Sequence, residues 1–252
     1  IMKRKKMLIA HRGLSATYPE NTLPAFEQAL RLDVDAIEFD VHMSRDGELV
    51  ITHDDRIDRC SNGTGRVRDL TFEELRRLDF GSWKAPEFAG TRIPTLTEVL
   101  DLVEERRPGL YLCVELKEDD CVCARKVIRE LERRNRLGNC SIISFQPGML
   151  YFARGMNENV FPHGFIHESE LGLPEKEGYL KLVRRVGVSR GELSGTFSAK
   201  LHALGIEVDS WAADNEEELR RMLDCDVDTI TSNAPDRIIH LLKPQPYERK
   251  SI

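Results

Sequence analysis

The sequence lacks several features that would assign a protein to a class at once. No apolar run approaches the length of a membrane-spanning helix, and Met7–Ala10, the apolar stretch after the basic N-terminal cluster, is too short for a secretory signal. Basic residues are not in excess, because 37 Lys and Arg face 43 Asp and Glu. The basic stripe of a nucleic-acid-binding protein is therefore not expected. The six cysteines follow neither a zinc nor a disulfide spacing. We expect a cytoplasmic protein with reduced thiols, no nucleic-acid partner and no stable membrane insertion.

What the chain does contain is an alternation of apolar segments of strand length with amphipathic segments of helix length. Eight strands are predicted, over residues 7–10, 36–41, 48–53, 109–117, 140–145, 160–166, 206–211 and 228–232, whereas residues 167–195 give no clear pattern. This alternation favours a parallel sheet. A length of 252 residues, with no G-x-G-x-x-G after the first strand, favours closure into a (β/α)8 TIM barrel over an open doubly wound sheet.

One interval breaks the alternation. The segment between His53 and Pro94 is rich in Asp, Arg and Gly and is too long for a plain strand-to-helix connection. We predict that residues 54–93 form a small subdomain inserted after the third strand, within a single catalytic barrel that spans residues 1–252.

Ionisable side chains gather where the predicted strands end. In a barrel of parallel strands these ends meet at one rim, which is where such barrels carry their chemistry. The residues concerned follow four successive predicted strands: His11 and Arg12, Glu38 and Asp40, His53, and Glu115 and Lys117.

The carboxylates among them predict a metal site. Glu38 and Asp40 are two residues apart on a strand, so both side chains face the same way, and Glu115 ends a neighbouring predicted strand. Carboxylates that share one space repel each other unless a cation neutralises them. Hard oxygen ligands select Ca²⁺ or Mg²⁺. The alternative is that Glu38 and Asp40 form ion pairs with Arg12 or Lys117.

The remaining groups suit phosphoryl-ester chemistry. Two histidines beside a cation, His11 and His53, suit a general acid and a general base. Arg12 and Lys117 add positive charge that could hold a phosphate. His163 and His167, in the segment HGFIH, are interpreted as structural residues because the segment is strand-like and lacks the H-E-x-x-H pattern.

Several motifs in this order resemble the glycerophosphodiester phosphodiesterase family: HRG through PENT (residues 11–22), IEFDV, DGELVITHD, ELK, SF and the strand that ends at Trp211. The resemblance extends over roughly residues 7–240. It implies a TIM barrel, a divalent metal ion, Ca²⁺ or Mg²⁺, and a small-molecule glycerophosphodiester as substrate. The implied reaction converts substrates such as glycerophosphocholine or glycerophosphoethanolamine to sn-glycerol 3-phosphate and an alcohol.

The resemblance also implies a role for each matching residue. The implied roles are metal binding by Glu38, Asp40 and Glu115, acid/base catalysis by His11 and His53, phosphate binding by Arg12 and Lys117, a glycerol pocket walled by Phe145 and Trp211, and a loop with Glu20 and Asn21 that orients the surroundings of His11.

The C-terminal part departs from the family pattern at two places. Asp214 stands where the family usually has asparagine, and Asn233 stands where it usually has aspartate. We expect these changes to alter the lining of the pocket and so the choice of alcohol group.

Two other functions compete with this one. A lysophospholipase D-type phosphodiesterase would need an apolar entrance, which Phe80, Trp83 and Phe88 could provide. A non-catalytic barrel could bind phosphate esters without turning them over. The sequence does not decide between a cyclic intermediate and direct attack by water, nor which histidine is the acid.

Overall fold

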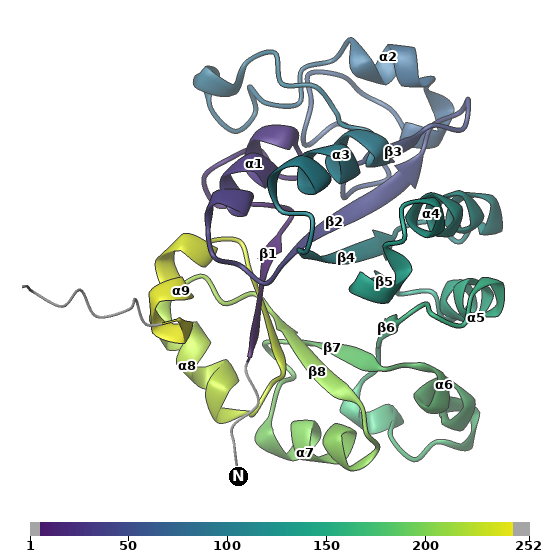
Figure 1. Cartoon of the computed structure of the whole chain (residues 1–252), viewed down its shortest axis with the longest axis vertical. Coiled ribbons are helices and arrows are strands. Elements are labelled where there is room, and N and C mark those ends of the chain that lie inside the picture. Colours follow the sequence, from purple (N-terminus) through teal and green to yellow (C-terminus); the bar gives the residue numbers. More distant parts are fainter. Residues whose placement is uncertain (1–5, 244–252) are drawn as a thin grey trace, which may run out of the picture.

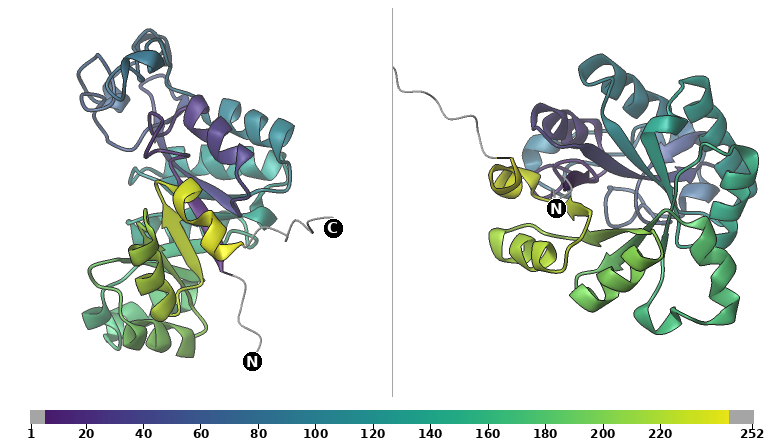
Figure 2. Two further views of the ribbon diagram at one scale, coloured as in Figure 1. Left: turned by 90° about the vertical axis from the view of Figure 1, so that its left-hand side faces the viewer. Right: turned by 60° about the horizontal axis from the view of Figure 1, so that its bottom comes forward.

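The backbone closes into a barrel of parallel strands surrounded by helices. The computed structural model describes residues 6–243. In hydrogen-bonding order the ring comprises β1 (Met7–His11), β2 (Ala36–Met43), β4 (Tyr111–Leu116), β5 (Cys140–Ile143), β6 (Pro162–Phe165), β7 (Arg185–Ser189), β8 (Glu207–Trp211) and β9 (Thr229–Ser232), which pairs again with β1. The ring with its outer helices is visible in Figure 1 and in the right-hand view of Figure 2. The predicted TIM barrel is confirmed.

The helices on the outside of the ring follow the strands in sequence. They are α1 (Leu23–Arg31), α3 (Leu96–Arg106), α4 (Cys121–Arg133), α5 (Pro147–Met156), α6 (Glu177–Leu182), α7 (Gly195–Ala203), α8 (Glu216–Asp224) and α9 (Pro235–Leu242). Within residues 6–243, no helix combines the length and the apolar character needed to cross a membrane.

The set of barrel strands differs from the prediction at two places. The segment predicted over 48–53 forms the short strand β3 (Leu49–Ile51), which pairs antiparallel with the end of β2 and lies outside the ring. The missing barrel strand is β7, within the region that gave no clear pattern. Its sequence hides the strand because Arg185 and Gly187 interrupt the apolar alternation. Arg185 is nevertheless buried, where its guanidinium pairs with Glu207 at 2.7 Å.

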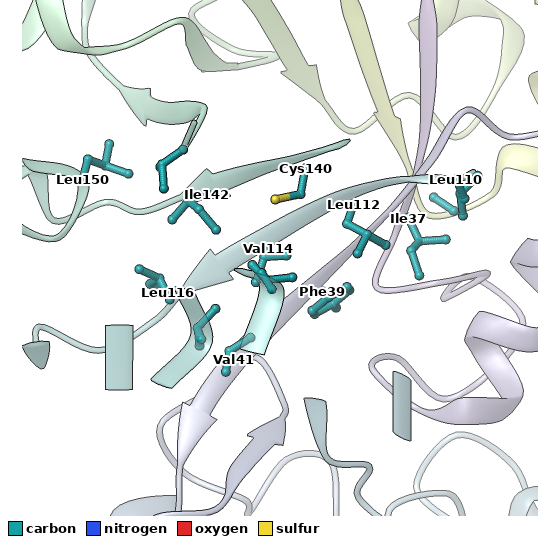
Figure 3. Close-up of a cluster of buried hydrophobic side chains, with 14 of the residues drawn as sticks. Ile37, Phe39, Val41, Leu110, Leu112, Val114, Leu116, Cys140, Ile142 and Leu150 are labelled. Atoms are coloured by element: carbon teal, nitrogen blue, oxygen red, sulfur yellow. The ribbon is translucent and has the colours of Figure 1, made fainter. Parts of the chain in front are cut away.

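The apolar core lies mainly between the barrel and the helices. On β2 and β4 alternate side chains point outward to this core, and Figure 3 shows them gathered along the two strands: Ile37, Phe39 and Val41, and Leu112, Val114 and Leu116. Burying one such side chain contributes about 1.5–3 kcal/mol. Because side chains alternate along a strand, the residues between them face the interior of the barrel. Those residues include all three predicted metal ligands.

Residues 54–93 lie over one end of the barrel, at the top of Figure 1. They contain α2 (Phe72–Arg76), two single-turn 3-10 helices and a separate apolar cluster that includes Ile57, Leu75 and Phe80. Polar contacts join this segment to the loop after β1. Arg59 binds Glu20 at 2.9 Å, and the Lys84 ammonium donates to the carbonyl of Ser15 at 2.7 Å. The segment thus lies against the loop that follows β1.

Candidate active site

The strand register gathers the three predicted metal ligands. β2 lies between β1 and β4, so that His11 stands opposite Glu38 and Asp40 stands opposite Glu115. All three acidic side chains face the barrel interior, and one oxygen from each lies within 4.8 Å of the others. Two strands that are far apart in the sequence, β2 and β4, therefore place three buried carboxyl groups close together.

Each carboxyl group has a different set of partners. Glu38 Oε2 accepts the backbone N–H of Arg12 at 3.0 Å. Asp40 Oδ2 accepts from the Asn21 amide at 2.7 Å and also lies 3.3 Å from Arg12 Nε. Glu115 Oε1 accepts from Lys117 Nζ at 2.7 Å. Of the alternative ion pairs, those of Asp40 with Arg12 and, at 3.5 Å, with Lys117 are present, whereas Glu38 meets Arg12 only through a backbone N–H; these contacts do not satisfy every oxygen.

The pKa values of the three carboxyl groups shift in different directions. Burial and the neighbouring Asp40 charge raise the pKa of Glu38 well above its usual value. The same two causes raise the pKa of Glu115 to about 7. Burial also disfavours the charged form of Asp40, but the charges of Arg12 and Lys117 outweigh it and lower the pKa of that carboxyl. With all three carboxyl groups ionised, their negative charge would exceed the two positive charges of Arg12 and Lys117, and the raised pKa values favour protonation that relieves this excess.

These residues fit a divalent cation. Among the residues that the structure describes, Glu38 Oε1 and Asp40 Oδ1 are buried and have no hydrogen-bond partner, although Lys117 Nζ lies 3.5 Å from Asp40 Oδ1. Leaving a buried carboxylate oxygen unpaired is costly. All the donors are hard oxygens, which suit Ca²⁺ or Mg²⁺ better than a softer metal. Glu38, Asp40 and Glu115 would hold such a cation, whose charge would offset the burial and the repulsion that raise the two glutamate pKa values.

His11 is held by a chain of hydrogen bonds from the end of β9. Its Nδ1 lies 2.7 Å from Asn233 Oδ1, and Asn233 Nδ2 donates to Asp214 Oδ2 at 2.8 Å. Asp214 Oδ1 accepts the backbone N–H of Asn233 at 2.7 Å. Because a carboxylate can only accept, the Asn233 amide nitrogen must face Asp214 and its oxygen must face His11. Burial and the nearby Arg12 charge lower the pKa of His11 to about 4.

His53 has a carboxylate partner instead of an amide. Its Nδ1 lies 2.6 Å from Asp54 Oδ1, and Arg59 Nε donates to Asp54 Oδ2 at 2.7 Å. Burial opposes ionisation of Asp54, but the hydrogen bonds from Arg59 and His53 lower its pKa to about 2. Burial lowers the pKa of His53, and the Asp40 charge opposes this shift.

The loop after β1 requires unusual backbone angles. Arg12 has φ +55° and Gly13 has φ +84°, both in the left-handed region. A Cβ at Gly13 would lie 2.6 Å from the backbone carbonyl carbon of Ala25, so only glycine fits there. The turn directs the Arg12 guanidinium to Glu20, with an Nη1–Oε1 distance of 2.8 Å. Asn21, also left-handed at φ +58°, contacts the acidic cluster rather than His11.

Of the predicted metal-binding, acid/base and phosphate-binding residues, all except Asp40 border one cavity of about 140 Å³ inside the mouth of the barrel, together with an aromatic wall. We define the aromatic wall as Phe145, Phe165 and Trp211. The first two rings stack 3.6 Å apart, and the last two meet edge to face at 5.4 Å. Gly187 makes room for them, because a Cβ there would lie 2.5 Å from the Phe165 ring. Phe145 remains 56% exposed at the rim.

A model of the glycerophosphoryl diester phosphodiesterase family matches residues 11–237. The chain belongs to this family. It is 32% identical to the glycerophosphodiester phosphodiesterase of Caldanaerobacter subterraneus subsp. tengcongensis over 249 residues, which cover 95% of this chain and 98% of the relative.

Solved structures of the family agree with the fold. A phosphodiesterase of Oleispira antarctica, solved in complex with the product sn-glycerol-3-phosphate, superposes with a TM-score of 0.82 at 25% identity and covers 91% of this chain and 93% of that one. A glycerophosphodiester phosphodiesterase from Agrobacterium tumefaciens gives a TM-score of 0.77 at 25% identity, with 92% and 97% covered. As a member of this family, the chain is a phosphodiesterase.

Within this phosphodiesterase, the structure adds residues that sequence reasoning did not place at the site. Phe165 completes the aromatic wall, and Gly187 leaves room for its ring. Asp214 and Asn233, expected to change the pocket lining, instead lie behind His11 and do not border the cavity. The sequence contains an indication that these two residues are partners, because the two departures from the family pattern exchange an acid and an amide. Only the folded chain shows that these two side chains bond to each other.

Proposed function

We propose that this phosphodiesterase hydrolyses glycerophosphodiesters, such as glycerophosphocholine or glycerophosphoethanolamine, to sn-glycerol 3-phosphate and an alcohol. The observation that carries the proposal is the cavity, which combines an acidic cluster, two histidines and two cations. A small phosphodiester needs such a set: charge to bind its anion, one group to take a proton and another to give one. The product named for the Oleispira relative is consistent with it.

The acidic cluster would hold the metal ion. Glu38, Asp40 and Glu115 supply the oxygens that would bind Ca²⁺ or Mg²⁺. When bound, such an ion supplies positive charge that stabilises the charge developing on phosphate oxygens.

Arg12 and Lys117 would bind the phosphate from the protein side. Both cations also pair with carboxyl groups, at 2.8 Å between Arg12 and Glu20 and 2.7 Å between Lys117 and Glu115. Glu20 also binds Arg59, so Arg12 is fixed at one end of a charged network. Such a fixed guanidinium suits a planar, two-point contact with phosphate oxygens.

We propose separate roles for the two histidines, and their hydrogen-bond partners support the choice. Since Asn233 offers His11 an acceptor oxygen, the proton of neutral His11 resides on Nδ1 and Nε2 carries the lone pair. His11 is therefore the proposed base. Asp54 offers His53 a carboxylate, which stabilises a protonated imidazole in a way that an amide oxygen cannot. His53 is therefore the proposed acid, which protonates the leaving alcohol.

His11 would take its proton from the attacking oxygen. We propose that this oxygen is the 2-hydroxyl of the substrate glycerol, which gives a cyclic glycerophosphate that water then opens with the histidine roles reversed. A substrate whose 2-hydroxyl is replaced by hydrogen tests this step. Normal hydrolysis of that substrate would show direct attack by water instead.

The lysolipid alternative needs an apolar entrance, and the contacts of its three residues favour packing roles for them instead. Phe80 is buried and Trp83 packs against the same cluster within residues 54–93. Phe88 packs on Tyr18, with ring centroids 5.2 Å apart. We propose that residues 54–93 act as an insertion that covers the rim of one catalytic barrel, rather than as a lipid entrance.

The test is a metal-supplemented panel of substrates. The purified protein is assayed with Ca²⁺ or Mg²⁺ on glycerophosphocholine, glycerophosphoethanolamine and lysophosphatidylcholine, and sn-glycerol 3-phosphate and choline are measured separately. We expect turnover of the two glycerophosphodiesters and its loss in Glu38→Gln. Preferred turnover of the lysolipid would favour the lysophospholipase D-type function. Metal binding without turnover of any diester would favour the non-catalytic barrel.

A further inference from the structure

The active-site cavity continues below the acidic cluster into the barrel. Because alternate residues on a strand face the same side, each inward residue has a partner two positions earlier, one layer deeper. Cys113 lies below Glu115 on β4, His163 lies below Phe165 on β6, and Asp209 lies below Trp211 on β8. All three deeper residues border the same cavity as the catalytic groups. We call His163 and Asp209 the polar floor.

The polar floor is incompletely hydrogen-bonded. His163 is only 2% exposed, yet neither of its ring nitrogens has a hydrogen-bond partner among the described residues. Asp209 Oδ1 accepts from the Thr229 hydroxyl at 2.6 Å and the Thr231 hydroxyl at 3.1 Å, whereas Oδ2 accepts from the Thr231 hydroxyl at a longer 3.4 Å. His163 Nε2 and Asp209 Oδ2 are 4.0 Å apart. A buried polar pair left open in this way needs a partner from the cavity.

The spacing of the pair suits a single hydroxyl group. An oxygen placed between the two atoms can lie about 2.8 Å from each, a normal hydrogen-bond length. Burial and the Arg185 charge lower the pKa of His163 well below its usual value, so the ring is neutral and offers one donor and one acceptor. A hydroxyl can donate to Asp209 and accept from His163. The other substrate groups fit less well. A phosphate would be repelled by the Asp209 carboxylate, and a trimethylammonium group has no O–H to donate to it.

We propose that the polar floor binds the terminal hydroxyl of the glycerol half of the substrate. The proposal rests on the proposed function, because it places the phosphate at the acidic cluster. It gives the substrate a direction: the glycerol half points down into the barrel, and the alcohol half leaves past the exposed ring of Phe145. The floor then selects for glycerol while the open rim admits different alcohols.

The test compares two substrates that differ only in this hydroxyl. They are sn-glycero-3-phosphocholine and 2-hydroxypropyl phosphocholine, which keeps the 2-hydroxyl and lacks the terminal one. A hydrogen bond to a charged group predicts that the protein with its wild-type sequence prefers the first substrate about ten- to hundredfold in kcat/KM. His163→Leu and Asp209→Asn should each bring this ratio close to one. Ile143→Val, an apolar change in the same cavity, should leave the ratio as it is.

A binding measurement separates this proposal from the proposed function. Calorimetric titration with glycerol 3-phosphate and with 2-hydroxypropyl phosphate needs no turnover, and we expect the same preference in Kd, lost in Asp209→Asn. A wild-type ratio near one in kcat/KM and in Kd, as a resident water would produce, overturns the proposal. A preference for the terminal hydroxyl that persists in both His163→Leu and Asp209→Asn also overturns the proposal. If circular dichroism shows that one of these variants is unfolded, the result from the folded variant is used. Failure of the proposed function has another signature, no turnover of either diester with Ca²⁺ or Mg²⁺.

Discussion

Exchanging Asp214 and Asn233 tests how His11 is positioned. In the double variant Asp214→Asn/Asn233→Asp, each hydrogen bond of the present pair has a counterpart. The new asparagine can still accept the backbone N–H groups of residues 233 and 234 and can donate to the new aspartate. The new aspartate can accept from His11 Nδ1, as the amide oxygen does now at 2.7 Å. What changes is that the negative charge moves next to His11.

The size of the effect follows from the change in distance. At an effective dielectric constant of about 20, a unit charge interacts by about 4 kcal/mol at roughly 4 Å and by about 2.4 kcal/mol at roughly 7 Å, a difference of about one pKa unit. The nearer carboxylate favours protonated His11 and so raises its pKa. Neutral His11 is the proposed base, so kcat/KM falls when the pH is lowered through the pKa of His11. In the double variant this fall should begin at a pH about one unit higher than in the unmodified protein.

The single variants supply the control for folding. Asn233→Asp sets two carboxylates against each other, and Asp214→Asn sets two amide N–H₂ groups against each other. Each should lower the free energy of unfolding by about 1–3 kcal/mol, and the double variant should recover most of it. The assays are urea denaturation of all four proteins and a pH profile of glycerophosphocholine hydrolysis. The reasoning fails if the double variant keeps the unmodified pH profile, or if its loss of stability equals the sum of the single losses.

Three further predictions concern the catalytic groups and the cavity. His11→Ala and His53→Ala should each lower kcat about 10²–10⁴-fold in an assay of sn-glycerol 3-phosphate release, and near-normal turnover by both would end the acid/base assignment. Gly187→Ala should push the aromatic wall into the cavity, lowering stability by about 1–3 kcal/mol and raising KM; an unchanged Tm and KM would contradict this. Since the pKa of Glu115 is raised to about 7, protonated Glu115 must lose its proton when metal binds, so Ca²⁺ affinity should rise between about pH 6 and pH 8, and a pH-independent Kd in calorimetry would refute it.

The sequence predicts those site residues whose relative positions follow from their spacing along a strand. Glu38 and Asp40 are two apart on one strand, so their shared face follows from the strand period alone. The position of Glu115 beside them follows from the pairing of β4 with β2. These positions agree with the predicted site, whereas the roles of the individual residues stay predictions.

Other features depend on contacts between distant segments. Asn233 reaches His11 across 222 positions, and nothing local in either segment indicates the bond. β7 was missed because Arg185 and Gly187 interrupt its apolar pattern, although each has a reason in the folded barrel: Arg185 pairs with Glu207, and Gly187 leaves room for the Phe165 ring. β3 was mistaken for a barrel strand because a short apolar run carries no information on whether its partner is parallel or antiparallel.

The central claim is that Glu38, Asp40 and Glu115 together bind one divalent ion that the hydrolysis requires. The most direct measurement titrates Ca²⁺ or Mg²⁺ into chelator-treated protein by calorimetry while glycerophosphocholine hydrolysis is followed in the same samples. We predict one ion per chain, activity that returns in proportion to its binding, and loss of both in Glu38→Gln and Glu115→Gln. Full activity after exhaustive chelation, or unchanged binding in those two variants, would contradict the account.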